Sequence, residues 1–271
     1  MSHVRRIYID SRLRSGGTDS DFTYDLPRGI EIPDSTIAYV DSVFCPNVFT
    51  TLHGLNNRLY VIEGENGASD ERTLLLQEGN YTGEELRALL ETSLNANKLL
   101  SGNYIVTYEE KTGNYKIANS TGTWFLPTRQ DLTTTGGVWS SSTITEADLR
   151  VCHDVIGYTT DSLYLNGVLT MGGFVDLLPY KTLFLCSSTF GNLGQSVGPV
   201  GQGDIVRRIV VNAGFGHLIH DLHSTAADYV DVSLTQLSQM HWRLTDEKGR
   251  VVSLEGHDMS ILDLLLGKQI V

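Results

Sequence analysis

The chain has 271 residues, a formal net charge of −12 and three cysteines. Its length allows one large all-β domain or two smaller ones. Its acidity argues against general nucleic-acid binding, because phosphate is repelled over most of the surface. Cys45, Cys152 and Cys186 are far apart and form no C-x-x-C pair, which favours reduced structural thiols in a protein folded inside a cell.

The N-terminal part of the chain is predicted to form strands. Apolar and polar residues alternate at residues 4–9, 22–26 and 36–44, and the second of these runs stops at Pro27. A further strand is expected at residues 59–62. The opening residues lack the apolar stretch of a signal peptide, so we expect no secretory leader.

One basic stretch interrupts this acidic sequence. Arg5, Arg6, Arg12 and Arg14 crowd the first seventeen residues, where Asp10 is the single acid. The stretch is either a solvated start to the first strand, or an arm that docks on an acidic neighbouring subunit or on packaged nucleic acid. The four arginines are therefore candidate interface residues.

One clear helix is predicted, at about residues 82–95. Thr82 and Glu85 have the spacing of a capping box, in which each side chain accepts a hydrogen bond from the backbone N–H of the other residue. Leucines then follow at helical spacing and form one apolar stripe: Leu86, Leu89, Leu90 and Leu94.

The helix is expected between a strand at residues 73–77 and a hairpin at residues 104–118. Residues 120–148 are rich in Thr, Ser and Gly, which is typical of a long surface excursion. Trp124 and Trp139 lie in this segment. They are either core anchors or exposed aromatic residues at a subunit interface or a glycan-binding face.

The C-terminal part returns to strand patterns. A turn is expected at residues 246–249, and the longest apolar run is too short to span a bilayer. Eight to ten strands with long, uneven connections favour an antiparallel sandwich or jelly roll over a parallel α/β sheet. The expected strands of this part are residues 182–186, 205–211, 229–232, 240–245 and 261–266.

His217, His220 and His223 are the one candidate metal-ligand cluster, with Asp221 as a possible fourth ligand. On a strand, His220 would face away from the other two histidines. On a helix, side chains three residues apart point in progressively different directions, whereas the two histidines of a zinc site usually lie four residues apart. A polar strand-and-loop segment is therefore favoured over a metal site.

Motifs for chemistry are otherwise missing from the sequence. The Gly-rich residues 191–203 contain no phosphate-binding loop, and no serine lies in a G-x-S-x-G elbow. We therefore expect a protein without catalytic residues or cofactors.

The order of several segments resembles the minor capsid (penton) proteins of virophages, Polinton-like viruses and adintoviruses. The segments that carry this resemblance are IYIDSRLRS, IAYVDSVFCPNVFTTLHGLNNRLYV, LLLQEGNYTGEELRALLETSLNA, YIVTYEEKTGNYKIAN, DIVRRIVVNAGFGHLI and WRLTDEKGRVVSLEGHDMSILDLLL. The resemblance runs over most of the chain and is weakest in residues 120–180.

The resemblance implies a single jelly-roll β-sandwich formed by residues 1–65 and 151–271, with residues 66–150 as an inserted strand, helix and hairpin. It also implies a homopentamer that plugs each vertex of an icosahedral virion, among capsomers of a double jelly-roll major capsid protein. A vertex fibre or cement protein could sit on this plug. The N-terminal arginines, Trp124 and Trp139 would then contribute to subunit contacts.

Two other functions remain open from the residues. A virion spike or lectin-like attachment module would present surface aromatic residues around residues 124–139 as a sugar platform. A hydrolase on a jelly-roll scaffold would bring His217, His220 and Asp221 together in an inward cluster.

Overall fold

The computed structural model describes residues 5–135, 138–140, 143–146, 148–190, 196–222, 229–232 and 236–268. The chain divides into two compact units. Unit 1 comprises Met1–Phe49 and Tyr180–Val271, and unit 2 comprises Thr50–Pro179. Unit 2 thus interrupts unit 1 in sequence, and it begins before and ends after the expected insertion at residues 66–150. No helix in the described ranges is long and apolar enough to cross a membrane.

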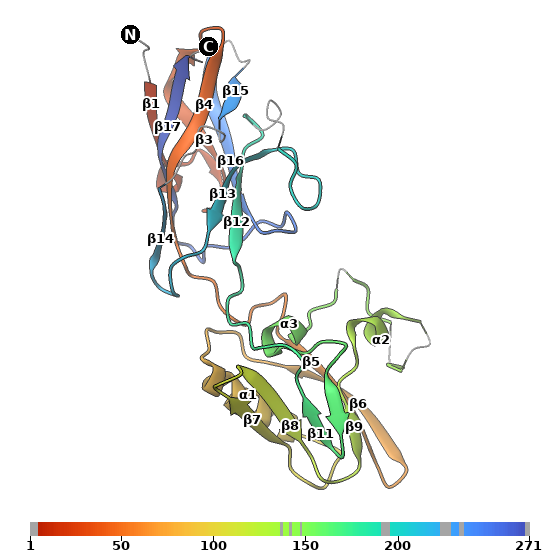
Figure 1. The fold of residues 1–271 in the computed structure, drawn as a ribbon. Coiled ribbons are helices and arrows are strands. Elements are labelled where there is room, and N and C mark those ends of the chain that lie inside the picture. The colour runs from red at the N-terminus through yellow and green to blue at the C-terminus, as the bar shows by residue number, and fades with distance from the viewer. Residues whose placement is uncertain are drawn as a thin grey trace. The chain divides into compact units, whose positions relative to one another are not determined.

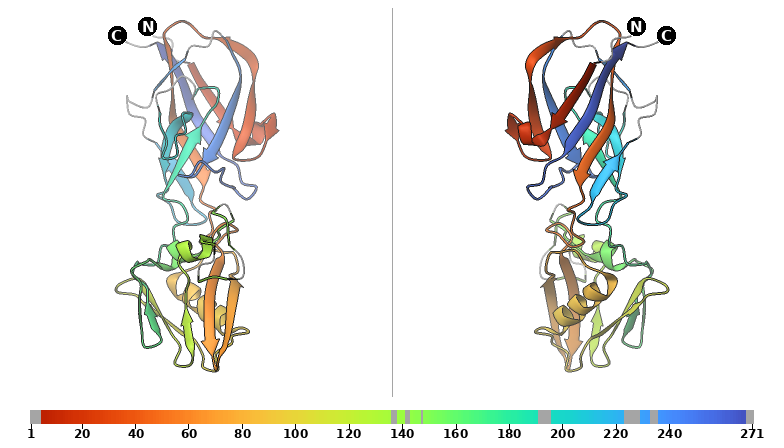
Figure 2. Two further views of the ribbon diagram at one scale, coloured as in Figure 1. Left: turned by 90° about the vertical axis from the view of Figure 1, so that its right-hand side faces the viewer. Right: turned by 90° about the vertical axis from the view of Figure 1, so that its left-hand side faces the viewer.

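Unit 1 is an all-β, jelly-roll-like sandwich of two antiparallel sheets (Figures 1 and 2). Sheet 1 has the order β1 (Arg5–Asp10), β17 (Ser260–Lys268), β4 (Thr36–Pro46) and β14 (Leu218–Asp221), and β15 (Val230–Val232) also pairs with β4. Sheet 2 has the order β13 (Ile205–Val210), β12 (Thr182–Cys186), β16 (Gln236–Thr245), β3 (Asp21–Glu31) and β2 (Gly16–Gly17). A short 3-10 helix, η1 (Ser11–Leu13), connects β1 to β2.

The core of unit 1 lies between these two sheets and follows the alternation of the strands. Phe22 of β3, Val40 of β4 and Trp242 of β16 are buried in one cluster with Ile261 of β17. At one side of the sandwich, the buried guanidinium of Arg207 on β13 forms an ion pair with Asp221 on β14 and donates to the backbone carbonyl of Val40. This bridge joins the edge strands of the two sheets.

Strand β3 continues through Pro27, so the expectation that it ends there is wrong. The register with β16 shifts between Leu237 and Gln239, where Asp25 pairs with Gln239 and Ile30 pairs with Leu237. Pro27 therefore lies in a bulge. A proline is tolerated there because the ladder needs no N–H donor at that position.

The two ends of unit 1 that flank the insertion lie side by side. Phe49, the last residue before unit 2, packs edge-on against Tyr180, the first residue after it, with ring centroids 5.0 Å apart. Both residues join the core cluster of unit 1.

The described residues of unit 2 form two further antiparallel sheets and three helices (Figure 1). Sheet 3 has the order β6 (Ala68–Leu75), β5 (Arg58–Glu65) and β9 (Thr123–Phe125). Sheet 4 has the order β10 (Leu163–Leu165), β11 (Val168–Thr170), β8 (Asn114–Ala118) and β7 (Ile105–Glu109). The helices are α1 (Gly83–Asn95), α2 (Arg129–Thr133) and α3 (His153–Ile156).

Helix α1 confirms the predicted helix. Thr82 is its N-cap, and both hydrogen bonds of the capping box with Glu85 are present. Leu86, Leu90 and Leu94 are fully buried in the core of unit 2, and Leu89 is partly buried against it. The cap sets where this helix begins, and its apolar stripe sets which face packs inward.

Candidate assembly surfaces

Arg5 and Arg6 lie at the start of an edge strand. Among the described strands, β1 pairs with β17 alone, and both arginines are exposed. Ile7 and Ile9 point into the core, and Tyr8 between them is 56% exposed. Among the residues that the structure describes, Arg5 makes no ion pair. The beginning of β1 therefore presents the basic side chain of Arg5 beside a strand edge that no other described strand pairs with.

Arg12 and Arg14 are paired within the chain. The Arg12 guanidinium donates to both carboxylate oxygens of Asp10, and this hydrogen bond lowers the pKa of the Asp10 carboxyl below its usual value. Arg14 donates to the backbone carbonyl of Ser11 at 2.7 Å and lies 3.4 Å from Asp258. These two arginines thus hold the turn after β1 in place.

Trp124 and Trp139 lie in the core of unit 2, which corrects the expected surface excursion at residues 120–148. Their side chains are only 1% and 5% exposed. Trp124 packs edge-on against Tyr104, and Trp139 packs in the same way against Tyr60, each with ring centroids 5.2 Å apart. Neither indole ring is exposed for contact with a second subunit or a glycan.

The structure does not bring the histidines of residues 217–223 together as ligands. His220 on β14 stacks on Phe44 with ring centroids 3.9 Å apart, and His217 is exposed. Asp221 forms its ion pair with Arg207 instead. His223 lies outside the described residues. Within the described ranges, no group of three or more His, Cys, Asp or Glu side chains could hold a metal.

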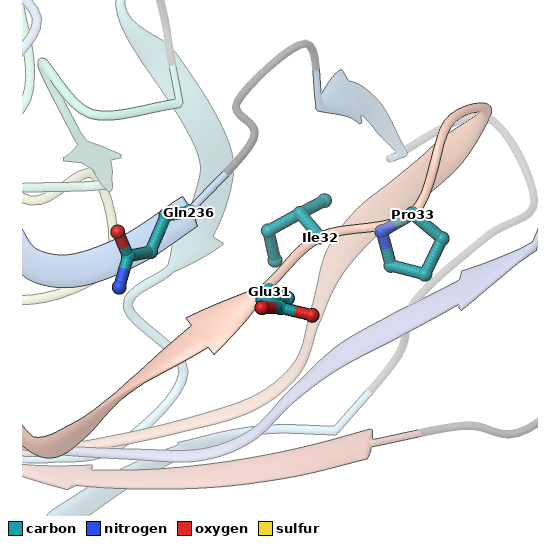
Figure 3. A pocket seen from close by; sticks show the side chains of 4 residues that line it. All are labelled: Glu31, Ile32, Pro33 and Gln236. Carbon is teal, nitrogen blue, oxygen red and sulfur yellow. The ribbon is translucent and has the colours of Figure 1, made fainter.

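A shallow hollow of about 450 Å³ lies at the end of β3 (Figure 3). Glu31, Ile32 and Pro33 line it from one side, and Gln236 at the start of β16 lines it from the other. Among the described residues, this lining supplies one carboxylate and one amide. General acid–base or covalent catalysis requires a nucleophile or acid with a partner within hydrogen-bonding reach, and the described lining holds no such pair.

The outer face of sheet 4 is an exposed apolar surface that the sequence analysis did not predict. Opposite residues of adjacent strands share a face of a sheet, and the register places a row of apolar side chains across all four strands. We define the sheet 4 face by the apolar side chains of this row, together with one leucine of the adjacent row: Leu165, Val168, Ala118 and Ile105, with Leu163.

No family model and no curated protein sequence matches this chain. Among solved structures, the crystal structure of the selenomethionine-labelled penton protein of mavirus is similar to it, with a TM-score of 0.51. The match covers 98% of this chain and 100% of that chain at 10% sequence identity. Over almost its whole length, the chain therefore has the fold of a virophage penton protein.

Proposed function

We propose that this chain is a minor capsid (penton) subunit, five copies of which form the vertex of an icosahedral capsid. The observation that carries this proposal is the extent of the similarity to mavirus penton protein, which includes the sandwich and its insertion. Jelly-roll sandwiches serve many unrelated functions. A match restricted to unit 1 would therefore say little, whereas a match over both units favours a shared role.

In this role the chain contacts its own copies and the surrounding capsid. Its location is the virion, its neighbours are double jelly-roll major capsid proteins, and a fibre or cement protein is a further possible partner at the vertex. A five-membered ring needs heterologous contacts, in which one face of a subunit meets a different face of the next. Arg5 and Arg6 belong to one such contact in our proposal, opposite an acidic surface.

The alternative functions are less well supported by the described residues. A lectin-like module or spike needs exposed aromatic residues around residues 124–139, but Trp124 and Trp139 are buried. A hydrolase needs an inward cluster at residues 217–221, but Asp221 is paired with Arg207 and His217 is exposed. A structural role without catalysis agrees better with both observations.

The native mass of the purified protein tests the proposal. The subunit mass is 29.9 kDa, so a pentamer has five times this mass, about 150 kDa. Mass photometry at low and moderate salt should show this species. A protein that stays monomeric, and that also fails to occupy vertices when it is assembled with its major capsid protein, would contradict the proposal. Glycan screening would then be the next experiment.

Reversing the charge of Arg5 tests the proposed basic contact. Deleting the N-terminal segment would be a poor test, because it removes β1 and its pairing with β17. Arg5→Glu should instead weaken pentamer formation about tenfold at low salt and less at high salt, since such exposed pairs are screened. Arg28→Glu, at an exposed position on β3, is the matched control. Equal effects of the two substitutions would count against a specific role for Arg5.

A further inference from the structure

The sheet 4 face is apolar where a solvated sheet face is normally polar. On the inner side of the sheet, Val106, Ile117 and Leu169 are buried in the core of unit 2. The alternating outward positions should then carry polar side chains. Instead, four aliphatic side chains are well exposed there: Ile105 at 59%, Leu163 at 55%, Leu165 at 58% and Val168 at 37%.

Helix α1 covers one of the two edges of sheet 4. At β7, side chains of α1 replace a neighbouring strand: the amide of Asn95 bonds both the N–H and the carbonyl of Tyr104, and Glu91 accepts from the N–H of Val106 at 2.9 Å. At β10, Tyr164 packs edge-on against Trp124 of sheet 3, with ring centroids 5.4 Å apart. The β7 edge is therefore paired within unit 2, and one side chain of β10 packs against sheet 3.

The charge distribution indicates what covers the face. Unit 2 carries 8 basic and 16 acidic residues, a net charge of −8, whereas unit 1 carries 12 and 16, a net charge of −4. Two copies of unit 2 therefore repel each other over most of their surfaces. The two outward rows that cross all four strands of sheet 4 contain no acid, and their single charge is Lys116 between Thr107 and Thr170. The third outward row lies on β7 and β8 alone and carries one acid, Glu109, opposite Asn114. Over these two rows, like-charge repulsion does not oppose contact with another copy.

From the exposed apolar row, and from the lack of acids in that row, we infer that the sheet 4 face is covered by a second copy of this chain. The inference rests on the proposed pentamer, and it places one of the ring contacts in unit 2. A contiguous exposed apolar patch on a protein surface commonly marks an interaction site. In a ring of five, this face meets a different surface of the next copy.

The double variant Ile105→Glu/Leu165→Glu tests the inference. It places one carboxylate at each end of the apolar row, on exposed positions of β7 and β10 that the fold of unit 2 does not bury. An unpaired charge in a desolvated contact is strongly unfavourable. The variant should therefore associate at least about 100-fold more weakly than the wild type, and high salt should not restore association.

Leu75→Glu is the matched control, because Leu75 is 71% exposed on β6 in the other sheet of unit 2. Native mass is measured for the wild type, the double variant and the control over a concentration series, and thermal unfolding checks that all three are folded. Loss of association in the double variant alone supports the inference.

The possible failures are distinguishable. If the wild type forms pentamers and the double variant forms them equally well, the inference is overturned and the proposed function stands. If the wild type forms a dimer that the double variant loses, the contact is supported and the pentamer is not. A wild type that remains monomeric at every concentration overturns the inference, and it also overturns the proposed function if the protein fails to occupy vertices when it is assembled with its major capsid protein.

Discussion

Replacing Arg72 with methionine should destabilise unit 2 and leave unit 1 unchanged. The Arg72 side chain is only 8% exposed, and its Nη1 lies 2.6 Å from Oε1 of Glu63, whose side chain is fully buried. Its Nη2 donates to the carbonyls of Ala96 at 2.6 Å and Leu94 at 3.2 Å. These carbonyls lie at the end of α1, where no helical N–H is available to them.

The expected loss follows from what remains around Glu63. Removing one partner of a buried ion pair costs about 3–5 kcal/mol, because the other charge stays buried. Glu63 keeps two donors, the Tyr104 hydroxyl at 2.7 Å and the Leu99 N–H at 2.8 Å. Methionine also preserves most of the apolar stem. We therefore expect the lower end of this range, about 3 kcal/mol.

Native-state hydrogen exchange read by mass spectrometry suits this test, because it resolves the two units. Peptides from α1 and β6 should exchange roughly 100-fold faster through global opening of unit 2, and peptides from β16 should not change. Arg87→Met is the control, since Arg87 pairs with Glu84 and Glu91 on the exposed side of α1 and should cost less than about 1 kcal/mol. Equal losses for the two variants would refute the reasoning.

Two further predictions concern unit 2. Burial lowers the pKa of His153 to about 4 from an ordinary value of 6.5. As the pH falls, His153 therefore becomes protonated at a higher pH in the unfolded chain than in the folded chain. The free energy of unfolding should decrease between pH 6.5 and pH 4, by up to about 3 kcal/mol. His153→Gln should flatten this part of the stability profile, measured as the free energy of unfolding against pH, and an unchanged slope would contradict the assignment. Gly67 and Gly157 both have positive φ, at 82° and 70°. Gly67→Ala should cost only about 1 kcal/mol of conformational strain, because an added Cβ there meets no atom within 4 Å. Gly157→Ala should cost clearly more, because its Cβ would lie 2.3 Å from the carbonyl oxygen of Gly173. Similar melting temperatures for the two glycine variants would contradict this comparison.

Features specified by local patterns could be predicted from the sequence. The alternation at residues 36–44 identified β4, and the spacing of Thr82 and Glu85 identified the start of α1. The fold class followed from many short strands with long connections. Each of these signals lies within one stretch of chain, so no knowledge of distant contacts was needed.

Features that depend on distant pairing could not be predicted. The passage of β3 through Pro27 depends on its register with β16, and the burial of Trp139 depends on its contact with Tyr60. The sheet 4 face appears only when strands far apart in sequence are aligned. One local signal was present, because Asn166-Gly167 between apolar residues is typical of a tight hairpin turn, and it connects β10 to β11.

The edge-on contact of Phe49 with Tyr180 has an evolutionary consequence. The chain leaves and re-enters the sandwich at adjacent points. The ends of the inserted segment, which we call the cassette, are therefore held close together by the sandwich itself. Closing such a loop costs little more entropy for a long insert than for a short one. Lineages can therefore lengthen, exchange or lose the cassette while the host sandwich keeps its packing. The sequence of the insertion can then diverge faster than the sequence of the sandwich.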